Sequence, residues 1–389
     1  MSTTITDNTF IDILNFIRST FNKPQGFIPL HAPYFGGNEK KYVLDTIEST
    51  FVSSVGAYVN KFEEMMQDIT GAKFAIATTN GTVALHLGLI VVGVKPGDLV
   101  ITQPLTFAAT ANAIKHAGAD PVFIDVDKDT MGLSPAAVAA WLKENCFTTE
   151  AGTFYKTTNQ RIGACVPMHT FGFPLRIMDL ATICKQYHIP LVEDAAESLG
   201  SYVGEQHTGT FGDIGIFSFN GNKTITSGGG GAIVANSEQL GKLAKHLSTT
   251  AKMPHAYEFK HDMIGYNYRM PNLNAALACA QLEQLDNMLE NKRELAEKYK
   301  LFFSGRNKEQ FVTEAPGTTA NYWLNTIIFN SPQEQQDFLQ YSNVNQVMTR
   351  PIWQLMNKLP MYQHCVSGLL PNASWLEERV VNIPSSYRP

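Results

Sequence analysis

The stretch FSFNGNKTITSGGGGAIVA, residues 217–235, combines two apolar runs with a lysine and four consecutive glycines. It begins with an alternating aromatic run typical of a buried strand and ends with a short apolar run that predicts a second strand. Between these runs lie Lys223 and the glycines at 228–231. A lysine that directly follows a buried strand is poorly solvated, which favours imine chemistry at its amine. The alternative is an ordinary surface lysine in a turn.

A nucleotide-binding P-loop is a rival interpretation of this stretch, and its spacing does not fit. The P-loop has glycine directly before its lysine. Here Asn222 separates Gly221 from Lys223, and the remaining glycines follow the lysine.

Short apolar runs alternate with helical patterns on the N-terminal side of this stretch. The predicted strands are Phe74–Thr78, Leu99–Gln103, Val122–Asp125, Ala164–Met168, Leu191–Glu193, Ile214–Phe219 and Ala232–Ala235. The predicted helices are Thr82–Val92, Thr110–His116, Pro135–Lys143 and Ile177–Tyr187. This alternation implies crossover connections and a mostly parallel sheet that is covered on both faces.

Both ends of the chain depart from this rhythm. Apolar side chains near the N-terminus recur at helical spacing, at Phe10, Ile13, Leu14, Ile17 and Phe21. They predict an amphipathic helix from about Asp7 to Phe21 that packs on its own domain or on a partner subunit. After about Ser248 a long helical pattern runs from Leu273 to Tyr299. We therefore expect a helical extension at 1–27, a large domain at 28–248 and a small domain at 249–389.

The composition is that of a chain that can bury a large core, since 44% of its 389 residues are hydrophobic. A formal net charge of -5, without a block rich in Lys and Arg, argues against nucleic acid or a membrane surface as the main partner. The five cysteines are spread apart, as reduced thiols of a cytoplasmic protein are. No stretch approaches the roughly 18 uninterrupted apolar residues of a membrane span. We expect a cytoplasmic location and small-molecule chemistry.

Polar residues follow several predicted strands at their carboxyl ends, where open α/β sheets bind their ligands. Asn80-Gly81-Thr82 opens a helix, so its backbone N–H groups suit a phosphate, although an ordinary helix cap would look the same. Asp194 ends an apolar strand, where a carboxylate needs a partner such as a protonated pyridine nitrogen. A helix cap or a metal ligand is the alternative for Asp194. Because no His or Cys cluster accompanies it, we predict no metal.

Together these segments resemble the pyridoxal-phosphate-dependent sugar aminotransferases of the DegT/DnrJ/EryC1/StrS family, a branch of the fold-type-I superfamily. The resemblance covers nearly the whole chain. Its markers occur in the family's order: Asn80-Gly81-Thr82, Pro104-Leu105-Thr106-Phe107, Glu193-Asp194-Ala195-Ala196, Phe217-Ser218-Phe219 with Lys223, Gly265-Tyr266-Asn267-Tyr268-Arg269-Met270, and Arg350-Pro351. It implies an α/β fold with a mostly parallel seven-stranded sheet flanked by helices, and a smaller α+β C-terminal domain.

The resemblance also implies roles for single residues. Lys223 would bind pyridoxal 5'-phosphate as an imine and move the proton between substrate and cofactor, while Asp194 would pair with the pyridine nitrogen. Phe107 would stack on the ring, unless it only packs in the core. Glu197 stands where the family often has Gln or His near the ring hydroxyl. The phosphate contacts would be Gly81, Thr82 and Ser218, with Asn267 reaching over from the neighbouring subunit of a homodimer.

Two positions separate this chain from other family patterns. Related dehydratases have histidine in place of Lys223, so its retention favours transamination over dehydration. Gly229 replaces the glutamate of the family's usual Thr-Gly-Glu-Gly-Gly run, so the contact of that glutamate is absent or supplied elsewhere.

The substrate is indicated by two further stretches, His31-Ala32-Pro33 and Phe51-Val52-Ser53-Ser54-Val55-Gly56. They resemble family members that aminate C4 of a UDP-linked 4-keto-6-deoxy-N-acetylhexosamine, as in bacillosamine and legionaminic acid pathways. L-Glutamate would be the amino donor. A site for both a carboxylate and a diphosphate needs cations, for which Arg269 and Arg350 are candidates unless each forms a structural ion pair. His169 could line the sugar pocket or be structural.

Other functions compete with this interpretation. The nearest is transamination of another ketosugar, such as the GDP-linked precursor of perosamine. A pyridoxal-phosphate-binding regulator without turnover would need an appended DNA-binding or partner domain, and no such region is visible. An NAD-dependent oxidoreductase would need Gly-x-Gly-x-x-Gly after the first strand, which Asn80-Gly81-Thr82 does not provide.

Overall fold

The computed structural model describes residues 8–389, and its centre is a sheet built from strands that are distant in the sequence. A four-stranded sheet, β1-β11-β10-β7, and a three-stranded sheet, β3-β2-β6, join through the parallel bridges Cys165–Leu191 and Met168–Asp194. They form one seven-stranded layer in the order β3-β2-β6-β7-β10-β11-β1. The strands are β1 Phe74–Thr78, β2 Leu99–Thr102, β3 Asp120–Phe123, β6 Ile162–Val166, β7 Val192–Asp194, β10 Ile214–Ser218 and β11 Gly231–Ala235.

The direction of these strands agrees with the α/β prediction. β11 runs antiparallel to both of its neighbours, and the other neighbouring pairs are parallel. β3 and β6 each begin two residues before the strand that the apolar pattern predicted, at Asp120 and Ile162. The reason is pairing, because Leu99 of β2 has Asp120 on one side and Ile162 on the other.

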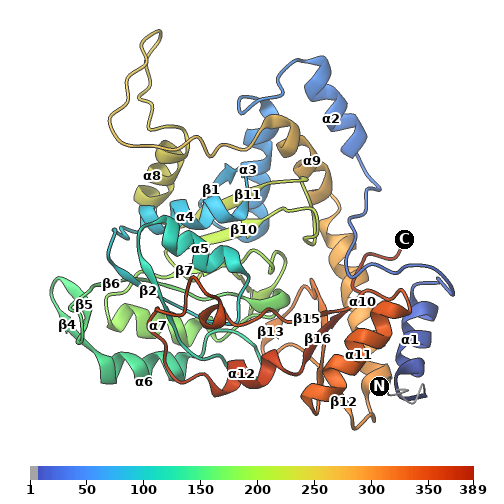
Figure 1. Cartoon of the computed structure of the whole chain (residues 1–389). Helices are drawn as coiled ribbons and strands as arrows, with labels where there is room; N and C mark the ends of the chain where they lie inside the picture. Colours follow the sequence, from blue (N-terminus) through green and yellow to red (C-terminus); the bar gives the residue numbers. More distant parts are fainter. Residues whose placement is uncertain (1–7) are drawn as a thin grey trace.

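Helices cover both faces of this sheet, as the fold prediction requires (Figure 1). One face packs against α4 Gly81–Val91, α5 Ala108–His116 and α8 Glu238–Ser248. The other face packs against α6 Pro135–Asn145 and α7 Ile177–Gln186 near β2 and β3, and against α3 Ala57–Thr70 and α9 Asn272–Leu282 near β1 and β11. Alternate residues along β2 point to opposite cores, which is why every strand position there is apolar or buried.

The C-terminal part forms a second, antiparallel sheet in the order β12-β14-β16-β15. Its strands are β12 Glu309–Phe311, β14 Asn325–Phe329, β15 Arg350–Pro351 and β16 Val380–Ile383, and its helices are α11 Pro332–Val344 and α12 Pro371–Glu377. The N-terminal helix α1, Asn8–Thr20, packs into the same core, where Phe10 meets Phe338 edge to face at 5.4 Å. The predicted first helical residue, Asp7, lies outside the described residues.

The long helical pattern predicted at Leu273–Tyr299 is two helices, since α9 ends at Leu282 and α10 runs from Leu285 to Phe303. α10 contributes to two cores: Leu285 and Met288 pack with the large domain, whereas Leu295 and Tyr299 pack with the small one. The division of the chain at residues 248 and 249 stays a prediction, and α9 packs against α3 of the large domain.

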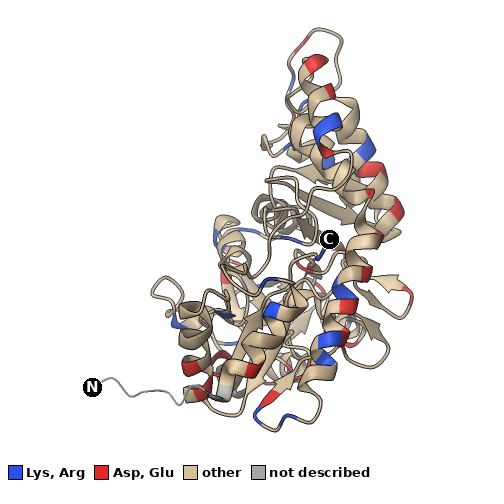
Figure 2. Ribbon diagram, turned by 90° about the vertical axis from the view of Figure 1, so that its right-hand side faces the viewer, with Lys and Arg blue, Asp and Glu red and all other residues tan. Residues whose placement is uncertain are grey.

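The remaining elements are short connections around these layers. They are α2 Glu39–Glu48, the hairpin of β4 Cys146–Thr149 and β5 Gly152–Tyr155, a small sheet of β8 Tyr202–Val203, β9 Gln206–His207 and β13 Thr318–Thr319, and the 3-10 turns Thr170–Gly172 and Met356–Lys358. Acidic and basic positions are interspersed along the helices in Figure 2. Between residues 8 and 389, no helix combines the length and apolar character needed to cross a bilayer.

Candidate active site

A cavity of about 340 Å³ lies at the carboxyl ends of β7 and β10, with walls from both domains. The residues predicted from the sequence that line it are Gly81, Thr82, Phe107, Asp194, Glu197, Ser218 and Lys223. Trp323 and Trp353 close it from the small domain. Residues that are far apart in the chain therefore meet in one site.

The phosphate corner lies at the start of α4. The Asn80 side chain accepts a hydrogen bond from the Val83 amide at 3.0 Å, so this residue is a helix cap. Gly81 follows, and a Cβ atom there would lie 2.9 Å from the Ser218 Cβ. A larger residue would fill this corner, and the start of the helix provides backbone donors and partial positive charge for an anion. The cap and the phosphate cradle are therefore compatible interpretations of one motif.

Asp194 ends β7 and is buried, with each carboxylate oxygen held by one donor. The Thr110 hydroxyl donates to Oδ2 at 2.7 Å and the Ala196 amide donates to Oδ1 at 3.2 Å. Burial raises the pKa of Asp194, and these donors together with the Lys223 ammonium oppose that rise. A cationic ring nitrogen in the cavity would favour the charged carboxylate in the same way.

Lys223 follows β10, and its ammonium contacts a buried carboxylate. Nζ lies 3.2 Å from Glu197 Oε1, while Glu197 Oε2 accepts a hydrogen bond from the Phe171 amide at 2.9 Å. Burial raises the pKa of Glu197 to about 7, against the opposing effect of the Lys223 ammonium. Glu197 can therefore hold or release a proton at neutral pH beside the amine.

A pH-dependent contribution to stability follows from Glu197. Because its folded-state pKa of about 7 lies above the ordinary 4.5, the folded protein binds the extra proton between these pH values. Because of this raised pKa, the free energy of unfolding of the cofactor-free protein should fall by about 3 kcal/mol as the pH rises from 4.5 to above 7. Glu197→Gln should remove that slope in urea titrations, whereas Glu144→Gln, at an exposed position of α6, should keep it. An unchanged slope in Glu197→Gln would contradict the assignment.

Phe107 precedes α5 and lies on the cavity wall with 55% of its surface exposed. An aromatic ring exposed inside a cavity fits a planar ligand that would cover its face. The alternative, plain core packing, does not agree with this exposure.

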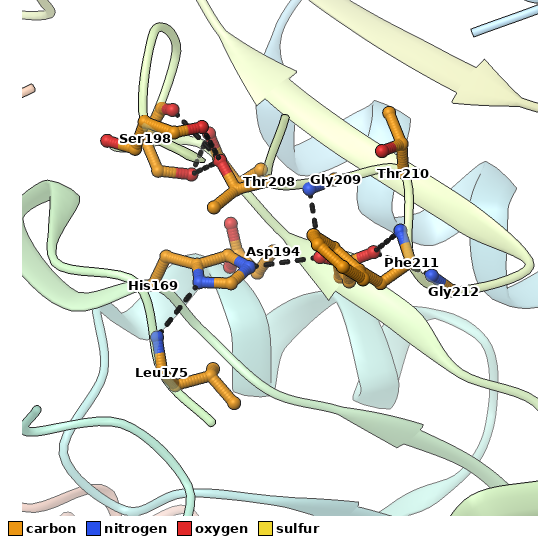
Figure 3. A network of polar contacts seen from close by, with 12 residues as sticks. His169, Leu175, Asp194, Ser198, Thr208, Gly209, Thr210, Phe211 and Gly212 are labelled. Carbon is orange, nitrogen blue, oxygen red and sulfur yellow. Dashed lines mark hydrogen bonds and ion pairs between the residues drawn. The ribbon is translucent and has the colours of Figure 1, made fainter. Parts of the chain in front are cut away.

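His169 does not line the cavity and is fully buried in the polar network shown in Figure 3. Its Nδ1 accepts a hydrogen bond from the Leu175 amide at 3.3 Å, and its Nε2 lies 3.0 Å from Glu193 Oε2. Glu193 also accepts hydrogen bonds from the backbone amides of Gly209, Phe211 and Gly212. This geometry assigns His169 to the support of β7 and not to a sugar pocket.

The other predicted binding residues lie away from this cavity. Arg269 lines a second cavity of about 440 Å³ together with Ser54, Val55 and Gly56, and its guanidinium donates to Asn267 Oδ1 at 3.2 Å. Arg350 is exposed in β15 and donates to Asn343 and to the Thr349 carbonyl, so it joins neither cavity. Arg269, but not Arg350, thus lies beside part of the stretch at 51–56 from which the substrate was predicted.

One His/Cys cluster was not predicted from the sequence. Asp120, His364 and Cys365 place possible ligand atoms within 4.8 Å of one another, and none of the three lines the active-site cavity. The Asp120 carboxylate is already paired with the Lys115 ammonium. The absence of a metal from the active site stays a prediction.

Thr110, Trp323 and Trp353 are site residues that no sequence motif indicated. Thr110 was predicted to lie on a helix, but its hydrogen bond to Asp194 joins positions 84 residues apart in the chain. The two tryptophans lie 100 and 130 positions beyond Lys223 in the chain. Rarity was the one available signal, because the chain has four tryptophans and rare aromatic residues are common in binding sites.

A lysine, a buried aspartate and a glycine-bordered anion corner at the carboxyl ends of this sheet define a fold-type-I pyridoxal-phosphate enzyme. The residues fit that cofactor: Asp194 suits the ring nitrogen, Phe107 the ring face and Gly81 the phosphate. The chain matches the DegT/DnrJ/EryC1/StrS aminotransferase family over residues 33–388 and belongs to that family. It is an aminotransferase, and its cofactor is pyridoxal phosphate.

Similar proteins support the same assignment over most of the chain. A GDP-perosamine synthase of Escherichia coli O157:H7 is 35% identical over 359 residues, covering 92% of this chain and 93% of that protein. EpsN of Bacillus subtilis, named a putative pyridoxal phosphate-dependent aminotransferase, is 36% identical, with 86% and 84% covered. The crystal structure of the aminotransferase TlmJ from Streptoalloteichus hindustanus superposes with a TM-score of 0.84 at 25% identity, covering 92% and 94%.

Proposed function

We propose that this enzyme transfers the amino group of L-glutamate to C4 of UDP-4-keto-6-deoxy-N-acetylglucosamine, giving the 4-amino sugar and 2-oxoglutarate. We infer the reaction type from one observation: Lys223, Asp194 and Glu197 line the same cavity. When bound, pyridoxal phosphate supplies an electron sink for a carbon that loses its proton.

The residues of the chain have separate tasks in this proposal. Lys223 holds the cofactor and carries the proton between substrate and cofactor carbons, since its amine is the base that lines the cavity next to a carboxylate. Asp194 keeps the proton on the ring nitrogen. Glu197, whose pKa is about 7, holds a proton beside Lys223. Gly81, Thr82 and Ser218 bind the phosphate.

The sugar nucleotide is proposed from the stretches at 31–33 and 51–56. Part of the second stretch, Ser54–Gly56, shares a cavity with Arg269, whose cation suits a carboxylate or a diphosphate. Lys245 lines the same cavity, although its ammonium is paired with Glu63 at 2.6 Å.

Transamination of a GDP-linked 4-keto-6-deoxy sugar is the second candidate. Two relatives favour it, because proteins named GDP-perosamine synthase from Escherichia coli O157:H7 and from Vibrio cholerae are each 35% identical to this chain.

We further propose a homodimer with shared active sites. Asn267 does not line the cavity of its own chain and is exposed, as expected of a residue that completes a neighbouring site. The adjoining segment 253–264 projects from the large domain between α8 and α9 (Figure 1). It exposes apolar side chains, with Tyr257 at 82%, Phe259 at 80% and Ile264 at 88%. Such a patch is typical of a surface that another copy covers.

A half-reaction screen tests the function. The enzyme is first converted to its amino form with L-glutamate, and the release of 2-oxoglutarate is measured. The amino form is then mixed with UDP-linked and GDP-linked 4-keto-6-deoxy sugars, and the 4-amino product is identified by mass spectrometry. Amination of the UDP sugar supports the proposal, and amination of the GDP sugar alone supports the second candidate. Bound cofactor without 2-oxoglutarate would instead indicate a regulator that has no turnover.

A further inference from the structure

Trp323 of the small domain lies directly against the ammonium of Lys223. The centre of its indole ring is 4.0 Å from Nζ, which is the geometry of a cation–π contact. The ring lines the active-site cavity and is 4% exposed. Lys223 therefore has two neighbours that attract its charge, the Glu197 carboxylate from the large domain and the Trp323 ring from the small domain.

Hydrogen bonds of Trp323 and of the neighbouring Asn321 hold the indole in this position. Its Nε1–H donates to the Asn222 carbonyl at 2.7 Å, on the residue that precedes Lys223. Its backbone amide donates to Asn321 Oδ1 at 2.8 Å. The Asn321 side chain in turn donates to the carbonyls of Glu197 and Leu199 at 2.8 and 2.9 Å. One small-domain segment thus fixes the loops that carry both Lys223 and Glu197.

A buried lysine of α10 holds the same tryptophan from behind. Lys292 Nζ donates to the Trp323 carbonyl at 3.1 Å and to the Ser385 carbonyl at 2.8 Å, and it lies 3.0 Å from His31 Nε2. These three contacts hold the amine of Lys292, which is 2% exposed and whose pKa burial lowers to about 7. The carbonyl side of Trp323 therefore has little freedom to move.

We propose that Trp323 is a positioning residue for Lys223, an inference that rests on the proposed function. The lysine side chain has a flexible four-carbon stem, so its amine can take many directions unless its surroundings restrict them. The indole face and the bond to Asn222 restrict both the amine and the turn that carries it. Lys223 is thus kept facing the cavity, where it must meet the cofactor.

The test compares Trp323→Leu with Trp323→Phe in the full chain, and uses Trp375→Leu as a matched control. Trp375 also has a cation over its ring, Lys128 at 4.4 Å, but it lies in α12 and outside the cavity. Two quantities are measured: the rate at which pyridoxal phosphate, trapped with borohydride, labels Lys223 of the cofactor-free protein, and kcat and KM of the loaded enzyme.

In Trp323→Leu, labelling and kcat should both fall about tenfold, while KM for the sugar nucleotide changes less than about twofold. Trp323→Phe keeps an aromatic face and should recover most of the labelling rate, and Trp375→Leu should label like the wild type. Wild-type labelling in Trp323→Leu would overturn the proposal. Equal losses in the Leu and Phe variants, in step with a lower Tm, would also overturn it, because they would indicate packing alone. Wild-type protein that labels at Lys223 but aminates no sugar would refute the proposed function without touching this comparison.

Discussion

Lys223→Ala is expected to lower kcat by roughly 10³-fold or more, because it removes both the cofactor link and the proton-transfer amine. No other amine lines the cavity to replace it among residues 8–389. The measurement is the formation of 2-oxoglutarate from L-glutamate in a single turnover, at saturating pyridoxal phosphate.

The control for this variant is Lys242→Ala. Lys242 lies in α8 with its side chain 70% exposed and paired with Glu238, so the loss of one surface amine should leave kcat unchanged. The Lys223 assignment would be wrong if Lys223→Ala kept activity within tenfold of the wild type, or if borohydride trapping labelled a different lysine.

Asp194→Asn is expected to lower kcat by roughly 10²- to 10³-fold, which is the effect of removing one preorganised electrostatic group. The two side chains have almost the same shape. The asparagine has one acceptor oxygen, so it can accept only one of the two hydrogen bonds that Thr110 and Ala196 donate to Asp194, and it carries no charge to hold a proton on a ring nitrogen. Stopped-flow absorbance of the glutamate half-reaction measures the loss.

Stability separates this electrostatic role from a folding defect. Burial raises the pKa of Asp194, so its charged form is disfavoured in the cofactor-free protein. The neutral amide removes the buried charge but loses one of the two hydrogen bonds, so the free energy of unfolding should stay close to that of the wild type. A variant that loses activity together with stability would contradict the assignment, as would a variant with wild-type kcat.

The sheet was predictable from the sequence because its strands are short apolar runs, and such runs keep their signal without knowledge of the partners. The phosphate corner and Asp194 were predictable for a related reason: they stand at strand ends, and strand ends meet at one edge. Strand limits such as Asp120 were missed, since pairing with β2 sets them and a polar residue hides them from the apolar pattern.

Contacts between distant segments could not be predicted in the same way. Trp323 contacts Lys223, which lies 100 positions earlier in the chain, and nothing local to Asn321-Tyr322-Trp323 indicates that partner. His169 follows a strand at the correct edge, yet its side chain turns beneath the sheet end toward Glu193. The sequence indicated at which edge of the sheet His169 lies, but not in which direction its side chain points. For Arg350, the Arg-Pro motif is present in the sequence, but the side chain lies on the surface and outside the cavity.

Helix α10 is 19 residues long and is anchored in both hydrophobic cores. A hinge between the two domains would have to bend this continuous rod, whose packed turns on either side of Lys292 oppose such bending. We therefore expect the spacing between Trp323 and Lys223 to change little during turnover. On this expectation, turnover would depend on how reactants enter and align in the cavity and would not need a closing motion between the two parts of the chain.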